Sequence, residues 1–274
     1  MHGALVALTT PFTADGSVDL DALGRHVERL VADGIDGVMP CGTTGEGALL
    51  EDDEVVAVTR RVVEAAAGAV PVVAHVGRPG TAATLRLAEA ALATGADAVS
   101  AVVPYYFPLP GERIVAHYEV LAGGLAGAPL LVYVIPSHAL NDLGAGDFET
   151  LLRAGVAGLK DSTKSLQRHR EYVAAARASE RVDAAVLVGS DTLLVEARRS
   201  GGSGSVTAMG NLMPAELSAL QRAADIGDWD EAERLQGLVV DARAQLGPGG
   251  TARATKRAIA AWLGDYPDHV RAPL

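Results

Sequence analysis

The chain has 274 residues, of which 49% are hydrophobic, and this size and composition are typical of one large globular domain. A net charge of −11 disfavours nucleic acid or an anionic membrane as a partner, and the single Cys41 excludes an internal disulfide or a cysteine-based metal cluster. No apolar stretch is long enough to cross a bilayer and residues 1–4 begin no signal peptide, so we expect a cytoplasmic protein.

Short β-branched runs alternate along the chain with longer segments in which apolar residues recur at helical spacing. Polar residues precede several of the helical segments, with Asp19, Thr81 and Asp191 as predicted N-caps. The short runs lack polar alternation, which is typical of parallel strands covered by helices. We predict eight strands, at residues 4–8, 37–40, 70–75, 98–103, 130–134, 156–160, 185–189 and 204–207.

Eight such units predict an α/β fold, a (β/α)8 TIM barrel over residues 1–210. The alternative is an open doubly wound sheet, but residues 8–12 after the first strand lack the glycine-rich turn that binds dinucleotides. Three further helical segments predict a C-terminal helical annex, residues 211–274, within the same domain. These segments are residues 214–226, 229–246 and 251–263.

Catalytic groups of such a barrel lie at the carboxyl ends of the strands, and Lys160 ends the predicted sixth strand. Unlike arginine, lysine can lose its proton and act as a nucleophile, and burial at an apolar strand end would lower its pKa. The chain's other two lysines, Lys164 and Lys256, can both be solvated, so Lys160 is the candidate nucleophile. The alternative is a structural lysine whose amine reaches water.

Other polar groups follow neighbouring strand ends. The second strand leads into Gly42-Thr43-Thr44-Gly45-Glu46, whose hydroxyls and backbone N–H groups could hold a carboxylate. Alternatively, Thr43 or Thr44 simply caps a helix. Tyr133 ends the fifth strand and could transfer protons beside Lys160, or could pack in the core with its hydroxyl satisfied.

Three further features lie on the predicted active face or near it. Tyr105 and Tyr106 form an aromatic loop that could pack at a subunit contact or place a hydroxyl in a neighbour's site. His75 and His138 are secondary candidates, and the seven histidines do not cluster at ligand spacing, so we predict no metal site. The glycine-rich residues 201–205 could hold a phosphate, or form an ordinary tight turn.

In their order and spacing, these motifs resemble the dihydrodipicolinate synthase/N-acetylneuraminate lyase family of Schiff-base lyases. The resemblance extends over nearly the whole chain. The segments that carry it are residues 7–12, 15–19, 42–47, 104–106, 133–136, 158–162, 201–211 and 270–274.

The resemblance implies a barrel with a C-terminal annex that forms a homo-oligomer, a dimer or a tetramer, and uses no cofactor. It implies that Lys160 forms an imine with pyruvate or a related 2-oxo acid, which then reacts with an aldehyde by making or breaking a carbon–carbon bond. Tyr133 would transfer protons, and Thr43 and Thr44 would hold the carboxylate. Thr44 would also relay protons toward Tyr106 of an adjacent subunit. The remaining pocket positions implied are Gly42, Gly189 and Val206.

The chain departs from the family pattern on the side of the pocket that would bind the second substrate. His138 stands where dihydrodipicolinate synthases usually carry an arginine that grips the aldehyde's carboxylate. His75 replaces a small residue, Val134 replaces an asparagine, and residues 139–141 replace a common Thr-Gly pair. We therefore expect aspartate semialdehyde to be a poor partner and a neutral or sugar-derived aldehyde to be a better one.

Three other functions stay open at this point. The protein could be a true 4-hydroxy-tetrahydrodipicolinate synthase of lysine biosynthesis, or a non-catalytic paralogue that binds a keto acid. A third hypothesis is a phosphate-binding barrel that uses residues 201–205 and gives Lys160 no covalent role.

Overall fold

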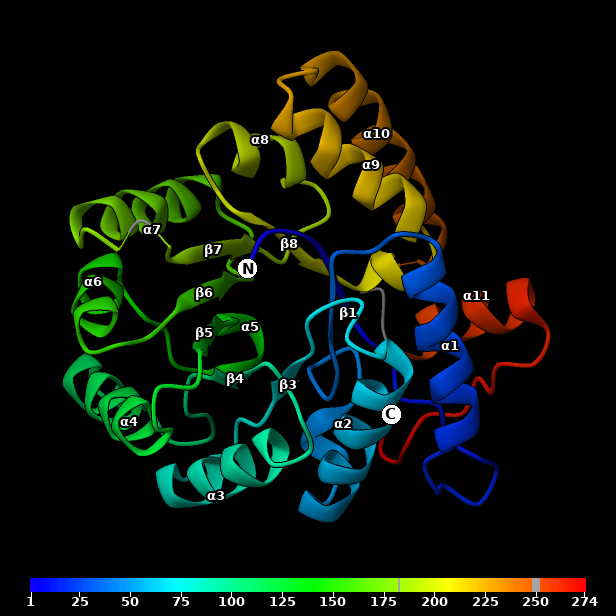
Figure 1. The fold of residues 1–274 in the computed structure, drawn as a ribbon, viewed down its shortest axis with the longest axis horizontal. Coiled ribbons are helices and arrows are strands. Elements are labelled where there is room, and N and C mark those ends of the chain that lie inside the picture. Colours follow the sequence, from blue (N-terminus) through cyan, green and yellow to red (C-terminus); the bar gives the residue numbers. More distant parts are fainter. Residues whose placement is uncertain (182, 248–251) are drawn as a thin grey trace.

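The computed structural model describes residues 1–181, 183–247 and 252–274, and within them eight strands alternate with helices around a barrel (Figure 1). All strand pairs are parallel, in the order β2-β1-β8-β7-β6-β5-β4-β3. This confirms the predicted (β/α)8 architecture. The strands are β1 (Gly3–Ala7), β2 (Gly37–Met39), β3 (Val73–His75), β4 (Ala98–Val102), β5 (Leu130–Val134), β6 (Gly158–Asp161), β7 (Ala185–Val188) and β8 (Gly204–Thr207).

The barrel closes between β2 and β3 through a single bridge. Val38 pairs with Val72, and the His75 N–H donates to the Pro40 carbonyl oxygen at 3.1 Å. The third strand starts later than predicted because Pro71 has no N–H to donate and the Val72 N–H binds the Asp97 carboxylate at 2.8 Å. The closing seam therefore has the shortest pairing in the barrel, one bridge against two to four paired residues between the other neighbouring strands.

Helices cover the outside of the barrel. Asp19 caps α1 as predicted, accepting from the Ala22 N–H at 2.9 Å. The other two predicted caps are wrong, because Thr81 is itself the first residue of α3 and α8 begins only at Leu194. The barrel helices are α1 (Leu20–Ala32), α2 (Asp52–Ala66), α3 (Thr81–Leu92), α4 (Gly111–Gly124), α5 (Pro136–Ala139), α6 (Ala145–Arg153), α7 (Leu166–Ala178) and α8 (Leu194–Arg199).

Apolar side chains fill the inside of the barrel, so it is a packed core and not a pore. Met39, Leu131 and Leu187 are all buried within this interior cluster. A larger cluster lies between the strands and the outer helices, with Phe12 and Phe148 among its fully buried members. The strands are thus buried on both sides, which explains why their sequences lack alternation.

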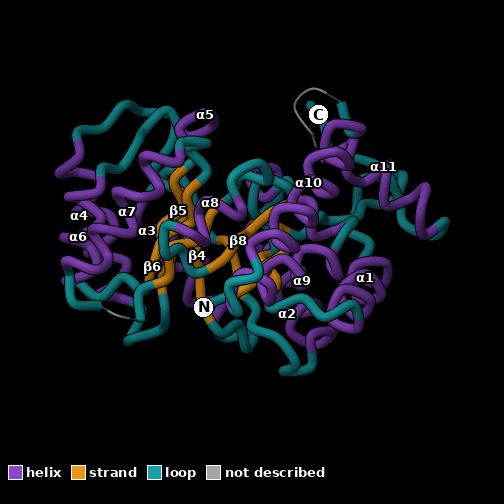
Figure 2. The backbone as a smooth tube through the Cα atoms, turned by 90° about the horizontal axis from the view of Figure 1, so that it is seen from above, coloured by secondary structure: helices purple, strands orange, loops and turns teal. Residues whose placement is uncertain are grey.

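Three helices follow the barrel: α9 (Pro214–Asp225), α10 (Trp229–Gln245) and α11 (Ala252–Leu263). Figure 2 shows them on the side of α1, away from α4 and α6. Leu217 and Leu220 of α9 share a buried cluster with Val188 and Leu194 of the barrel. None of the helices that the structure describes is long and apolar enough to span a membrane.

Lys256 in α11 is fully buried, so the prediction that it is solvated was wrong. Its Nζ forms an ion pair with Glu46, which lies in the loop after β2. It also donates to the His269 carbonyl oxygen at 2.8 Å and lies 4.1 Å from the centre of the Phe12 ring. A buried charge needs such partners, and here they come from distant parts of the chain.

Candidate active site

Lys160 points into the barrel from β6. It is paired in register with Tyr133 of β5 and with Leu187 of β7. Leu187 belongs to the interior cluster, and Tyr133 lies two residues after the interior Leu131, so all three side chains face inward. Only 4% of Lys160 is exposed. The amine therefore lies inside the barrel, near the carboxyl ends of the strands.

The Lys160 amine has aromatic and sulfur neighbours and no carboxylate partner within the described residues. Its Nζ lies 4.2 Å from the centre of the Tyr133 ring and 4.0 Å from Met39 Sδ. The adjacent Asp161 engages other groups, accepting from the Thr163 N–H at 2.8 Å and contacting His169 Nδ1 at 3.2 Å. The Lys160 charge is thus left without a neutralising ion pair.

A hydroxyl contact joins Tyr133 to the loop after β2. Thr43 Oγ1 lies 3.3 Å from the Tyr133 hydroxyl oxygen. Thr44 is half-buried beside it, and neither threonine caps a helix, because Glu51 is the N-cap of α2. The structure therefore excludes the helix-cap interpretation of this loop, and it places the Thr43 hydroxyl beside the hydroxyl of Tyr133.

His75 also lies against Tyr133. The two rings meet edge to face with centroids 5.6 Å apart, and His75 Nδ1 is buried without a hydrogen-bond partner. Burial, aided by the positive charges of Lys160 and Arg78, lowers the pKa of His75 from 6.5 to about 3. The imidazole is therefore neutral at physiological pH and adds no charge beside Lys160.

Tyr106 does not reach this centre within one chain. It is 77% exposed, and its described ring contact is with Phe107, which is 64% exposed. Its φ of 83° is unusual for a residue with a side chain. Half-buried Tyr105, just before it, packs against the core.

His138 is exposed on α5, directly after β5, and its Nδ1 lies 2.9 Å from Ser137 Oγ. On the other side of Lys160, the Gly189 N–H donates to the Asp161 carbonyl oxygen at 2.7 Å, and Val206 is buried in the interior cluster. A Cβ at Gly189 would lie 2.2 Å from Ser162 Oγ, so a side chain there would collide with the turn after β6.

Asp191, predicted above as a helix cap, is a largely buried carboxylate near this centre. It follows β7, its side chain is only 13% exposed, and Arg243 Nε of α10 lies 3.5 Å from its Oδ2. Burial raises the pKa of Asp191, while the charges of Arg243 and, to a smaller extent, Lys160 lower it. The sequence signal for this place is its position two residues after the predicted strand 185–189, at the end of the barrel where catalytic groups lie.

The glycine-rich residues 201–205 lie at the opposite end of the barrel, because they lead into β8 instead of following it. The Ser203 carbonyl oxygen accepts from the Gly3 N–H at 3.0 Å, and Ser203 Oγ accepts from the Val186 N–H at 3.0 Å. The loop is thus engaged in strand pairing, which contradicts the hypothesis that it holds a phosphate at the active face. In the part of the chain that the structure describes, no group of three His, Cys, Asp or Glu residues could hold a metal ion.

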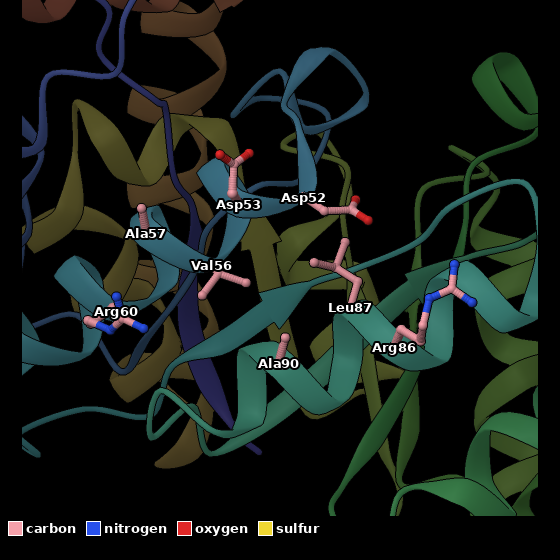
Figure 3. A pocket seen from close by; sticks show the side chains of 8 residues that line it. All are labelled: Asp52, Asp53, Val56, Ala57, Arg60, Arg86, Leu87 and Ala90. Atoms are coloured by element: carbon pink, nitrogen blue, oxygen red, sulfur yellow. The ribbon is translucent and has the colours of Figure 1, made fainter.

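A surface groove of about 450 Å³ lies elsewhere, between α2 and α3 on the outer helical layer (Figure 3). Two acidic residues, Asp52 and Asp53, and two basic ones, Arg60 and Arg86, share it with apolar side chains. It contains none of the predicted site residues, so it is separate from the centre around Lys160.

The sequence and fold match one family throughout. Residues 1–274 match the family model described as the dihydrodipicolinate synthetase family. The 4-hydroxy-tetrahydrodipicolinate synthase of Sorangium cellulosum is 36% identical over 277 residues, covering 100% of this chain and 90% of that protein.

Solved structures of proteins from this family have the same fold as this chain. The dihydrodipicolinate synthase of Aquifex aeolicus superposes with a TM-score of 0.92 at 30% identity, covering 100% of this chain and 92% of that one. The E. coli prophage protein YagE, a dihydrodipicolinic acid synthase family member crystallised with pyruvate, superposes with a TM-score of 0.94 at 26% identity. That match covers 100% of this chain and 92% of YagE.

Proposed function

Because the chain belongs to the dihydrodipicolinate synthase family, whose members are lyases and synthases of the class I aldolase type, we propose that Lys160 is the residue that forms the imine with pyruvate. The observation that carries this proposal is the environment of its amine. Nζ is buried on the Tyr133 ring without a carboxylate partner in the described residues. An amine held in an ion pair would have to leave its partner before attacking a carbonyl carbon, whereas the Lys160 amine has no such pair to break.

The proposed reaction begins when the neutral Lys160 amine attacks C2 of the 2-oxo acid. The carbinolamine formed loses its C2 oxygen as water, with Tyr133 donating and accepting the protons, and an iminium remains. The iminium withdraws electrons from C3, so a proton can leave C3 to give an enamine. The enamine carbon attacks the aldehyde carbon, so the C3–C4 bond forms as the C=O π bond breaks and the aldehyde oxygen takes up a proton. The reverse sequence cleaves the C3–C4 bond. Hydrolysis of the imine then releases the product and Lys160.

The keto-acid carboxylate would lie in the loop after β2. Thr43 and Thr44 offer hydroxyls there, and the Thr43 contact with Tyr133 supports this assignment. Gly42, Gly189 and Val206 would line the same pocket. Together these residues would fix C2 in front of the Lys160 amine, so that positioning contributes to the rate.

The second substrate would enter on the side of His75 and His138. His138 is short and exposed, and His75 is neutral, so neither of these two residues offers a fixed cation to the carboxylate of aspartate semialdehyde. We propose a neutral or sugar-derived aldehyde. The alternative, a true 4-hydroxy-tetrahydrodipicolinate synthase, is favoured by the names of relatives at 36% identity.

We also propose a homo-oligomer, a dimer or a tetramer, that functions in the cytoplasm. The exposed pair of Tyr106 and Phe107 supports a subunit contact, since large aromatic side chains are enriched at interfaces. In such a contact the Tyr106 hydroxyl would meet Thr44 of the neighbouring subunit and complete the proton relay.

Borohydride reduction in the presence of pyruvate tests the imine. Peptide mass spectrometry should find a reduced pyruvate adduct on Lys160, and the absence of an adduct would overturn the proposal. A panel of aldehydes then separates the substrates. Efficient turnover of aspartate semialdehyde would favour the synthase, and an adduct without turnover of any aldehyde would favour a non-catalytic keto-acid-binding protein.

A further inference from the structure

The loop that carries Thr43 and Thr44 is fastened from behind by residues far along the chain. We propose that Lys256 and Arg271, acting through the buried carboxylate of Glu46, are positioning residues for the keto-acid carboxylate site. The proposal rests on the proposed role of Thr43 and Thr44. It concerns how these two hydroxyls are held, and assigns no chemistry to Lys256 itself.

Glu46 controls the geometry of the loop through its backbone. Its N–H donates to the Thr43 carbonyl oxygen at 3.2 Å, and the next residue, Gly47, donates to the Gly42 carbonyl oxygen at 3.0 Å. Glu46 has the left-handed φ of 57°, which is unfavourable for a residue with a side chain unless its surroundings hold it. Glu46 therefore needs external contacts to maintain the turn in which Thr43 lies.

These contacts come from the C-terminal region and use both oxygens of the carboxylate. Oε1 accepts from Lys256 Nζ, and Oε2 accepts from the Arg271 N–H at 2.9 Å. Glu46 is 3% exposed and Lys256 is fully buried. Two donors on two oxygens fix both the position and the rotation of the carboxylate, which a single contact would not do.

Arg271 extends the attachment to the rest of the loop. Its guanidinium donates to the Leu49 carbonyl oxygen at 3.1 Å and to the Gly16 carbonyl oxygen at 2.6 Å, and it forms a two-point ion pair with Glu54 at the start of α2. The loop is thus held at Glu46, at Leu49 and at the helix that follows. On its other side the loop reaches Tyr133 through the Thr43 hydroxyl, and the Thr10 hydroxyl donates to the Gly45 carbonyl oxygen at 2.7 Å.

Stability alone does not account for a buried ion pair in this place. Taking both ions out of water costs several kcal/mol each, and well-packed apolar side chains of similar volume are often as stabilising. An apolar pair could attach the annex equally well, but it could not orient Glu46 through directed hydrogen bonds. The ionic pair is therefore better explained by the orientation that it imposes on the turn.

The test is a double variant, Glu46→Gln with Lys256→Met, which removes both charges so that no unpaired ion stays buried. The control is Arg257→Met, which removes the neighbouring residue of α11 and its exposed ion pair with Asp268. Borohydride trapping at Lys160 is compared for pyruvate and for methyl pyruvate, whose neutral ester cannot use a carboxylate site. The ratio of the two is independent of how much of each variant is folded.

We expect the double variant still to form the pyruvate adduct, but at a half-saturating concentration about 10- to 100-fold higher, the loss that a small displacement of a binding group causes. Its preference for pyruvate over methyl pyruvate should fall toward one, while the control keeps that of the wild type. A folded double variant with unchanged preference would overturn the inference. No adduct in the wild type would instead overturn the proposed role of Lys160.

The wild-type protein provides a second measurement that needs no variant to fold. If Glu46 couples the carboxylate site to the C-terminal region, pyruvate binding must stabilise the contact at Arg271 in return. Hydrogen exchange should then slow in the peptide that contains Arg271 and stay unchanged at the exposed start of α10. Slower exchange in the Thr43 loop alone would contradict the coupling.

Discussion

Lys160 and Lys256 are both buried, but their surroundings differ. Lys256 lies on the Phe12 ring and also pairs with Glu46, whereas Lys160 lies on the Tyr133 ring and has no carboxylate partner among the described residues. Burial lowers the pKa of Lys256, and its bond to Glu46 acts against this. The ion pair holds the Lys256 amine in one position, whereas the Lys160 amine has no carboxylate among the described residues to hold it. Burial alone therefore does not distinguish the two lysines, but their partners do.

The largest expected difference between the two lysines is in activity. Lys160→Met should lower kcat by at least about 10⁴-fold, because no other described group at this position can form the imine. Its thermal stability should not fall, because no buried carboxylate loses a partner. Turnover assays, borohydride trapping and thermal unfolding check both parts, and a trapped adduct elsewhere in the site would contradict the assignment.

The aromatic neighbour of Lys160 should matter through its hydroxyl. Tyr133→Phe should lower kcat by about 10²- to 10⁴-fold, since the ring stays but the proton-transfer group is lost. Tyr118→Phe is a matched control, because the Tyr118 hydroxyl is also buried and donates to the Ala101 carbonyl oxygen at 2.9 Å. The control should lose about 1 kcal/mol of stability and no activity. Equal losses of kcat in both variants would remove the special role of Tyr133.

Lys256, which is paired with Glu46, should show its effect in the free energy of unfolding. Lys256→Met should lower the free energy of unfolding by about 3–5 kcal/mol, because the buried Glu46 carboxylate loses a partner. Adding Glu46→Gln should recover part of this loss. Urea denaturation measures both variants. A Lys256→Met protein as stable as the wild type would mean that Glu46 finds another partner or water.

The smallest expected effect is the pH dependence of the stability that His75 contributes. The folded pKa of His75, about 3, lies below its unfolded value of 6.5, so the unfolded chain binds more protons between these values. The contribution of His75 to stability should therefore fall as the pH drops from 6.5 toward 3, by about 1.4 kcal/mol per pH unit in the steepest part. The stability difference between wild type and His75→Asn, measured in urea at pH 7.5, 6 and 5, should change accordingly. A pH-independent difference would show that His75 titrates normally.

Much of the barrel was predictable because its signals are local. Apolar runs marked all eight strands, and the parallel arrangement then placed Tyr133 and Lys160 at the same end of neighbouring strands. The Thr43 contact with Tyr133 follows from the same logic, since Tyr133 lies near the carboxyl end of β5 and Thr43 follows that of β2. In a parallel sheet, residues at equivalent positions of neighbouring strands lie side by side, so their places along the chain predict which of them meet.

The contacts of Lys256 were not predictable in this way. Lysine is rarely buried, so its residue type favoured solvent, and its partner Glu46 lies 210 residues away. Asp191 shows a different limit of prediction from sequence. A polar residue shortly after a strand can either cap the next helix or lie near the active end of the barrel. Local patterns do not decide between these alternatives, and only the packing of α8 and α10 does.

The two donors to Glu46 also have a consequence for the order in which the chain acquires its structure. Arg271 follows Glu46 by 225 residues, so a ribosome that adds residues from the N-terminus completes the barrel strands long before this contact can form. Until then the Glu46 carboxylate lacks both partners and favours water over burial. A nascent chain that already carries Lys160 would therefore have its proposed nucleophile in place while the proposed carboxylate site was still unformed.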